Sequence, residues 1–115
     1  MKYSESLKKN KDFQYIYRKG TSYANKYLVM YVLENGTGQN RLGISVSKKV
    51  GNSVVRSRSK RLITESYRLN EKNLKTGYDF VFIARNSIEG KSFFEVEEAM
   101  KKLFSKAGLY KQWRN

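Results

Sequence analysis

The chain contains no cysteine, no histidine and no proline. Without cysteine it can form neither disulfides nor thiolate metal sites, and it has no thiol nucleophile. Without histidine it lacks the side chain that most often moves protons near neutral pH, and it lacks imidazole metal ligands. Acidic residues are also few, 10 against 24 Lys and Arg, and only Asp12 and Asp79 are aspartates. These absences argue against an enzyme with a protein active site of its own.

Long hydrophobic runs are absent as well. No apolar stretch approaches the roughly 18 residues that a membrane-spanning helix needs. The first ten residues have no apolar core of the kind that a signal peptide carries. We therefore expect a cytoplasmic protein without a membrane partner. The length of 115 residues predicts a single domain over 1–115, with 1–9 as a mobile basic arm.

What the chain has instead is positive charge and aromatic side chains. The net charge is +14 and the pI is about 10.0. Hydrophobic residues make up 39% of the chain and aromatic residues 14%, which is enough to form a core and argues against disorder. Because so large an excess of one charge opposes compaction, we interpret it as serving a polyanionic partner.

The first half of the chain reads as a helix followed by strands. Asn10 is a candidate cap for a helix that Gly20 ends. Residues 21–33 have strand composition, with a break at Asn25-Lys26, and both faces of the strand are apolar or aromatic. Residues 34–40 read as a hairpin connection, and 41–47 as a strand that alternates apolar and small side chains.

The second half predicts a helix, a strand and a helix. Asn52 or Ser53 can cap a helix that runs to about Leu69. Residues 78–85 form an apolar strand suited to the centre of a sheet. Residues 92–108 carry a capping box and a helical apolar stripe that Gly108 ends.

The one acidic cluster is Glu95, Glu97 and Glu98. A metal-dependent nuclease would need such a group to hold its ions. We favour a simpler interpretation, in which Glu97 and Glu98 form helical ion pairs with the lysines four residues on, Lys101 and Lys102.

The densest basic segment is 48–61, where six of fourteen residues are cationic and none is acidic. On a helix, an apolar stripe separates two cationic flanks. The stripe consists of Val55, Ser59, Leu62, Ser66 and Leu69, and the flanks are Arg56 and Lys60 on one side and Arg58, Arg61 and Arg68 on the other. Free backbone N–H groups in the first turn add to the attraction for anions. The pattern favours polyanion binding over an ordinary solvated face, which would mix charges of both signs.

Aromatic residues are the second unusual feature, with nine tyrosines in the chain. Phe13 and Tyr17 share a helix face, and Tyr31 lies on a predicted strand. Aromatic side chains among cations can stack unpaired bases, although most aromatics in any domain pack in the core. Spacing alone leaves both roles open for these three residues.

Residues 45–63 resemble the signature of the protein subunit of bacterial ribonuclease P, a Ser-Lys-Lys-x-Gly-Asn turn followed by an Arg-Asn-Arg-x-Lys-Arg helix. Residues 7–13 and 82–85 agree with two further motifs of that family, in the same order. The family's middle Asn is Ser57 here, and a further basic position is Thr64. Both departures imply weaker or re-routed phosphate contacts.

The resemblance implies an α+β fold of order α-β-β-β-α-β-α. It implies one mixed four-stranded sheet with a left-handed βαβ crossover, like the second domain of ribosomal protein S5. Left-handed crossovers are exceptions to the usual rule, so the residue pattern alone could not indicate this one.

The resemblance also implies a function. A catalytic RNA would remove the 5′ leader of precursor tRNA by Mg²⁺-dependent hydrolysis, and the protein would have no catalytic residue, no metal, no organic cofactor and no small-molecule substrate. The residues implied to bind the catalytic RNA are Lys48, Lys49, Asn52, Arg56, Ser57, Arg58, Lys60, Arg61 and Arg68. Those implied to bind the precursor-tRNA leader are Phe13, Tyr17, Tyr31 and Arg85.

The sequence leaves three other functions open. A ribosomal or other structural RNA-binding protein without a processing role would have similar size and charge. A second is a self-sufficient nuclease, which the shortage of acidic residues disfavours. A third is a DNA-binding architectural protein, which the aromatic face disfavours.

Overall fold

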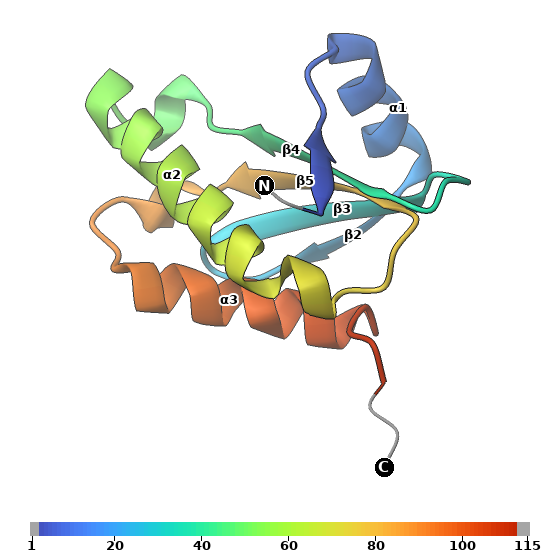
Figure 1. The fold of residues 1–115 in the computed structure, drawn as a ribbon. Helices are drawn as coiled ribbons and strands as arrows, with labels where there is room; N and C mark the ends of the chain where they lie inside the picture. Colours follow the sequence, from blue (N-terminus) through green and yellow to red (C-terminus); the bar gives the residue numbers. More distant parts are fainter. Residues whose placement is uncertain (1–2, 113–115) are drawn as a thin grey trace.

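The computed structural model describes residues 3–112 and shows an α+β fold around one mixed sheet of five strands, in the order β1-β4-β5-β3-β2 (Figure 1). The strands are β1 (Ser4–Ser6), β2 (Thr21–Ala24), β3 (Leu28–Glu34), β4 (Asn40–Ser45) and β5 (Tyr78–Ala84). The helices are α1 (Asn10–Lys19), α2 (Ser53–Asn70) and α3 (Phe93–Lys106). Short 3-10 turns precede α2 (η1, Lys48–Val50), follow it (η2, Glu71–Asn73) and precede α3 (η3, Asn86–Ile88).

The fifth strand is one that the sequence does not predict. β1 pairs in parallel with β4, with Ser4 opposite Asn40 and Ser6 opposite Leu42. The hydroxyl groups of Ser4 and Tyr67 lie 2.8 Å apart and share a hydrogen bond, and Leu7 is buried just beyond the strand. The expectation of a mobile arm is therefore wrong for these residues, because specific contacts hold them on the sheet. Met1 and Lys2, also part of the expected arm, lie outside the described residues.

The predicted hairpin between the third and fourth strands is also wrong. β3 and β4 are not neighbours, because β5 lies between them, antiparallel to β3 and parallel to β4. β5 is apolar enough to be buried between two partners, and α2 supplies the crossover that a parallel β4–β5 pair needs. The central place of β5 is confirmed. The break at Asn25-Lys26 is confirmed too, since it separates antiparallel β2 and β3.

Helices cover both faces of the sheet. Figure 1 shows α1 on one side, and α2 and α3 packed together on the other. The larger core lies beneath α2 and α3 and receives Leu28, Met30 and Val32 of β3. The smaller core lies beneath α1, where Ile16 and Val81 are buried and Tyr31 packs against them. Both faces of β3, which the sequence predicts to be apolar or aromatic, therefore pack against a core.

Helix starts follow the sequence closely at α2 and α3. The Asn52 side chain caps α2 by accepting a hydrogen bond of 3.0 Å from the Val55 N–H. Ser92 and Glu95 form the predicted capping box at α3. α1 differs, because its cap is Lys9, which makes no side-chain cap bond, and Asn10 is already helical. The ion pairs predicted along α3 do not form among the described residues, where only Arg41–Asp79 and Arg68–Glu65 pair.

The buried stripe of α2 is rotated from the prediction. Ser59 and Ser66 are buried as expected, but Leu69 is 49% exposed, whereas Ile63 and Tyr67 are fully buried. The Tyr67 ring contacts three phenylalanine rings of the core at centroid distances of 5.9–6.5 Å. Because packing this large ring gains more than burying Leu69 would, it decides which face of the helix meets the sheet.

Candidate nucleic-acid interfaces

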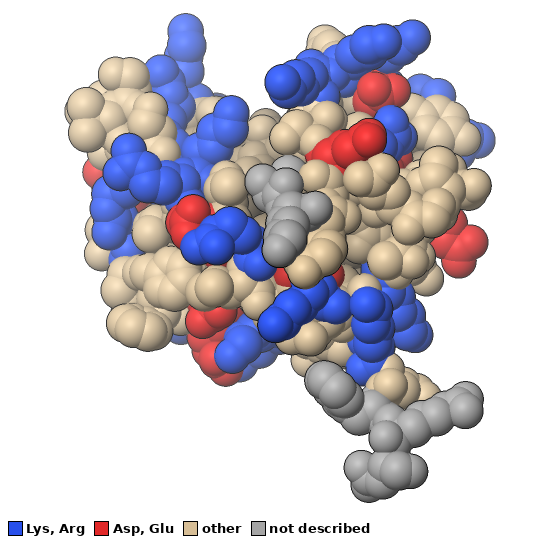
Figure 2. Space-filling model, in the orientation of Figure 1, with Lys and Arg blue, Asp and Glu red and all other residues tan. Residues whose placement is uncertain are grey.

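The first candidate surface is the basic face of α2 and the turn before it. Most of its predicted cations are exposed, and Arg56 is half-buried. Figure 2 shows Lys and Arg side chains gathered over α2, on the left, and again over α1, at the top right. Of the α2 cations, only Arg68 forms an ion pair within the described part of the chain. The others have no ion-pair partner in that part of the chain, which leaves their charges for an external anion.

Charge is uneven along α2. The Arg68 guanidinium lies 2.7 Å from the Glu65 carboxylate, and this hydrogen bond lowers the pKa of Glu65, so the carboxylate stays ionised at neutral pH. Its negative charge offsets that of Arg68 near the C-terminal end of the helix. The net positive charge of α2 is therefore concentrated in its first half, which follows Lys48 and Lys49 of η1. Arg58 is tied to the start of α3 through a bond of 3.1 Å to the Lys91 carbonyl oxygen.

The second candidate surface is a cleft between α1 and the sheet. Phe13 and Tyr17 come from α1 and Tyr31 from β3, and all three are half-buried. The Tyr17 ring lies edge-on to Tyr31 at 5.0 Å and tilted to Phe13 at 6.4 Å. The structure thus brings together three of the four residues predicted to bind a leader strand.

The cleft opens into a hollow of about 340 Å³ between α1 and β4. It is lined by Lys8, Asn10, Phe13, Gln14, Tyr17, Ile44 and Ser45. Burial raises the pKa of Tyr17, and a hydrogen bond with the Ser45 side chain opposes that rise. The phenol is therefore neutral at physiological pH and offers a ring face and a hydroxyl rather than a charge.

Sequence reasoning missed the residues of β4 that shape this cleft. A Cβ atom at Gly43 would lie 2.6 Å from the Phe13 ring, so the aromatic ring occupies space that only glycine leaves free. Ser45 follows on the same face of the strand and meets Tyr17. Small residues at alternate positions of a strand are a recognised signal of close approach, and they could have indicated this contact.

Arg85, the fourth predicted leader residue, does not line the cleft hollow. It is exposed just beyond the end of β5, and its Nη1 donates a bond of 2.9 Å to the Asn25 carbonyl oxygen. The structure therefore places it at the turn between β2 and β3, apart from the three aromatic side chains.

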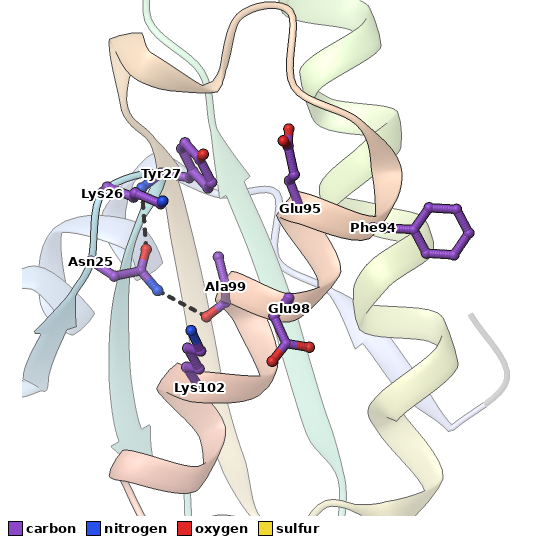
Figure 3. Close-up of a pocket in the computed structure, with 8 residues that line it drawn as sticks. All are labelled: Asn25, Lys26, Tyr27, Phe94, Glu95, Glu98, Ala99 and Lys102. Carbon is purple, nitrogen blue, oxygen red and sulfur yellow. Dashed lines mark hydrogen bonds between the residues drawn. The ribbon is translucent and has the colours of Figure 1, made fainter.

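A larger hollow, of about 690 Å³, lies between the β2–β3 turn and α3 (Figure 3). Asn25 and Ala99 both line this hollow, and the Asn25 side chain donates a hydrogen bond of 2.8 Å to the Ala99 carbonyl oxygen. Its charged rim mixes Lys26 and Lys102 with Glu95 and Glu98. Because this rim carries both signs, its chemistry is poorly suited to a polyanion, and α3 is the less favourable face for nucleic acid.

Metal donors are sparse on the described surface. Within residues 3–112, no group of three or more Asp or Glu side chains is placed to hold a metal ion. Nor does any helix in that part of the chain have the length and apolar character to cross a membrane.

Comparison with known proteins places the two surfaces in a family context. Residues 1–108 match the family model described as Ribonuclease P. The chain is 60% identical over 111 residues to the ribonuclease P protein component of Clostridium beijerinckii, covering 90% of this chain and 89% of that one. It is 58% identical over 105 residues to that of Clostridium acetobutylicum, with 90% and 88% covered.

Solved structures agree with the sequence matches. The fold is similar to the RNase P protein of Staphylococcus aureus, with a TM-score of 0.86, 35% identity, and coverage of 94% of this chain and 99% of that one. It is also similar to the RNase P protein of Thermotoga maritima, with a TM-score of 0.81, 33% identity, and 89% and 96% covered.

Proposed function

Because the chain belongs to the ribonuclease P protein family, we propose that its two surfaces divide the RNA binding of that enzyme between them. The chain is the RNA-binding protein component of a tRNA-processing ribonuclease, and its partner is the ribonuclease P RNA. Membership decides against a structural RNA-binding protein without a processing role.

The basic face of α2 binds the catalytic RNA. Its contact set is Lys48, Lys49, Asn52, Arg56, Ser57, Arg58, Lys60, Arg61 and Arg68. Support comes from the exposure of all of them except the half-buried Arg56 along one helix and its leading turn, and from the scarcity of ion pairs among them. Lysine and arginine that neutralise phosphates release counterions, which gives binding energy without reading sequence.

The α1–sheet cleft binds the single-stranded 5′ leader of precursor tRNA. This assignment is carried by one observation, the convergence of three aromatic rings, of which Phe13 and Tyr17 line an open hollow and Tyr31 packs against Tyr17. Base–aromatic stacking contributes about 1–3 kcal/mol per base and tolerates most sequences, which suits leaders of varied sequence. Arg85 contributes a cation at the far end of β5, beside the β2–β3 turn.

The catalytic RNA carries out the hydrolysis, and Mg²⁺ is held mainly by that RNA. The residues described in this chain offer no cluster of carboxylates that would fit the metal, so no step of the reaction is assigned to them. The protein's task is to hold two RNAs together by screening phosphate repulsion and by stacking the leader.

Replacing Tyr17 tests the leader cleft. In the holoenzyme, Tyr17→Ala should weaken binding of precursor tRNA by about 1–3 kcal/mol and leave mature tRNA, which has no leader, almost unaffected. The matched control is Tyr15→Ala, because Tyr15 lies on the same helix with 51% of its surface exposed and lines no part of the cleft hollow. Binding of both tRNA forms is measured for each variant.

Melting temperature is measured alongside, because Tyr17 also packs against the smaller core. Equal losses for precursor and mature tRNA, together with a large fall in melting temperature, would show that Tyr17 is only a core residue. Cleavage of precursor tRNA by the purified protein without any RNA subunit would overturn the assignment of the chemistry to the RNA.

A further inference from the structure

A third hollow, smaller than the two described above, lies where β1, β4 and α2 meet. Its volume is about 160 Å³, and it is lined by Ser6, Leu7, Lys8, Leu42, Ile44, Lys60 and Thr64. Three of these side chains are apolar, two are cations and two carry hydroxyl groups. At less than the roughly 300 Å³ of a typical drug-sized pocket, it has room for one ring-sized group only.

This hollow adjoins the leader cleft. Lys8 and Ile44 line both hollows, so the two are neighbours across the same pair of side chains. The pairing of β1 with β4 ends at Ser6 and Leu42, so β4 is an edge strand from Gly43 onward. A single-stranded RNA that leaves the cleft beside Lys8 therefore reaches this smaller hollow directly.

The charges at the rim suit a phosphate. Lys8 approaches from the segment between β1 and α1, and Lys60 from α2. Both are exposed, neither forms an ion pair within the described chain, and no acidic side chain lines the hollow. The cations thus stand beside an apolar floor, where Leu7 and Leu42 are buried.

Thr64 keeps the hollow open. Its hydroxyl donates to the Lys60 carbonyl oxygen at 2.8 Å, which holds the short side chain against its own helix. A long side chain at this position would extend into the space that the hollow occupies. The residue is half-buried and carries no charge, so it contributes shape rather than attraction.

We propose that this hollow docks one unpaired nucleotide of the precursor-tRNA leader, with its base against the apolar floor and its phosphate at Lys8 and Lys60, so that Lys60 contacts the leader in place of the catalytic RNA. The site extends the leader path from the cleft towards α2, and the inference rests on the proposed leader-binding function. An apolar recess rimmed by cations matches a nucleotide, which has a planar base attached to a charged backbone.

A single introduced thiol tests the site. The chain has no cysteine, so Thr64→Cys creates a unique reactive group of similar size. In the reconstituted holoenzyme, precursor tRNA should slow alkylation of this thiol at least several-fold relative to mature tRNA. Ser105→Cys is the control, because Ser105 is exposed on α3 and does not line this hollow, and its alkylation should be equal with both tRNAs.

The same measurement identifies the source of the nucleotide. Protection by the catalytic RNA alone, unchanged when precursor tRNA is added, would overturn the assignment to the leader. Equal alkylation rates in free protein, holoenzyme and substrate complex would overturn the site itself.

Two binding variants keep the two proposals distinguishable. Filling the hollow with Thr64→Tyr, or removing one rim cation with Lys8→Ala, should reduce the preference for precursor over mature tRNA several-fold. Lys106→Ala removes the same charge from α3 and should not. If these two variants behave as wild type while Tyr17→Ala loses the preference, the hollow is unused and the cleft stands. If Tyr17→Ala also keeps the preference, the leader-binding function itself is wrong.

Discussion

Gly43 shows how one residue shapes the cleft. Its backbone lies against the Phe13 ring, with Leu7 also close, and any side chain there would displace the ring. The sequence marks Gly43 only as the small member of an alternating strand. Because Gly43 has no side chain, the Phe13 ring, which would stack a leader base, can occupy the space beside its backbone.

Gly43→Ala should therefore disturb leader binding while preserving the fold. The Phe13 ring is the end of a flexible side chain at the edge of the cleft, so it can move aside, and the stability loss should be near the low end of the ~1–3 kcal/mol typical of overpacking. Losing part of one stacking contact, about 1 kcal/mol, should lower the preference for precursor over mature tRNA about fivefold.

Gly38→Ala serves as the control for that variant. A Cβ at Gly38 meets nothing within 4 Å, so this substitution should leave both stability and tRNA preference unchanged. If Gly43→Ala binds both tRNA forms as the wild type does, the position of Phe13 has no bearing on the leader.

At the scale of the element, α2 combines a packed face with an open cationic one. Ile63 and Tyr67 bury one side in the core, while Lys60 and Arg61 remain exposed on the other. Arg68 differs from the other cations of this helix because Glu65 already pairs with it and offsets part of its charge. The position of each arginine should therefore determine its contribution to RNA binding.

Two arginine variants measure this difference. Arg61→Ala should lower the slope of log affinity for the catalytic RNA against log salt by about 0.7–0.9, the value for one lost phosphate contact. Arg68→Ala removes the same charge but also frees Glu65, whose pair with it is solvent-exposed and weak, so its slope should change less. Equal changes, or no change for Arg61→Ala, would place the catalytic-RNA interface elsewhere.

At the scale of the whole molecule, Tyr67 joins the sheet, two helices and the N-terminal strand. Its ring contacts Phe80, Phe82 and Phe104, and its hydroxyl meets the Ser4 side chain. Burial raises the pKa of Tyr67 to about 12 from its ordinary 10.0. The folded state thus favours the neutral phenol, and the stability that this gives is complete below pH 10 and declines as the pH rises towards 12.

Tyr67→Phe should reduce this alkaline loss. Two pKa units correspond to on the order of 2–3 kcal/mol of stability, which the variant would no longer lose between pH 10 and 12. At neutral pH the variant should be less stable by about 0.5–1.5 kcal/mol, because the hydrogen bond to Ser4 is gone. Denaturant unfolding across this pH range measures both effects.

The control for the alkaline measurement is Tyr15→Phe, a change on the exposed face of α1. Its unfolding curves should follow the wild type at every pH. If Tyr67→Phe also lost stability above pH 10 in parallel with the wild type, titration of Tyr67 would not be the cause.

Local chemistry was enough to determine much of this protein from its sequence. The Asn52 cap, the Ser92–Glu95 capping box and the apolar run of β5 depend on residues a few positions apart, so their patterns are legible in the chain itself. The cationic character of α2 follows in the same way, because charge is a property of composition and helical spacing. The family resemblance at 45–63 rests on such a segment too.

Long-range contacts decided the rest. The insertion of β5 between β3 and β4 and the capture of Ser4–Ser6 as a fifth strand depend on residues tens of positions apart. So does the rotation of α2 that buries Tyr67 and exposes Leu69. The cleft itself is of this kind, because Phe13 can rest on Gly43 only after α1 has docked on the sheet. Such pairings are set by competition among all surfaces that could be buried, and no local pattern records the outcome.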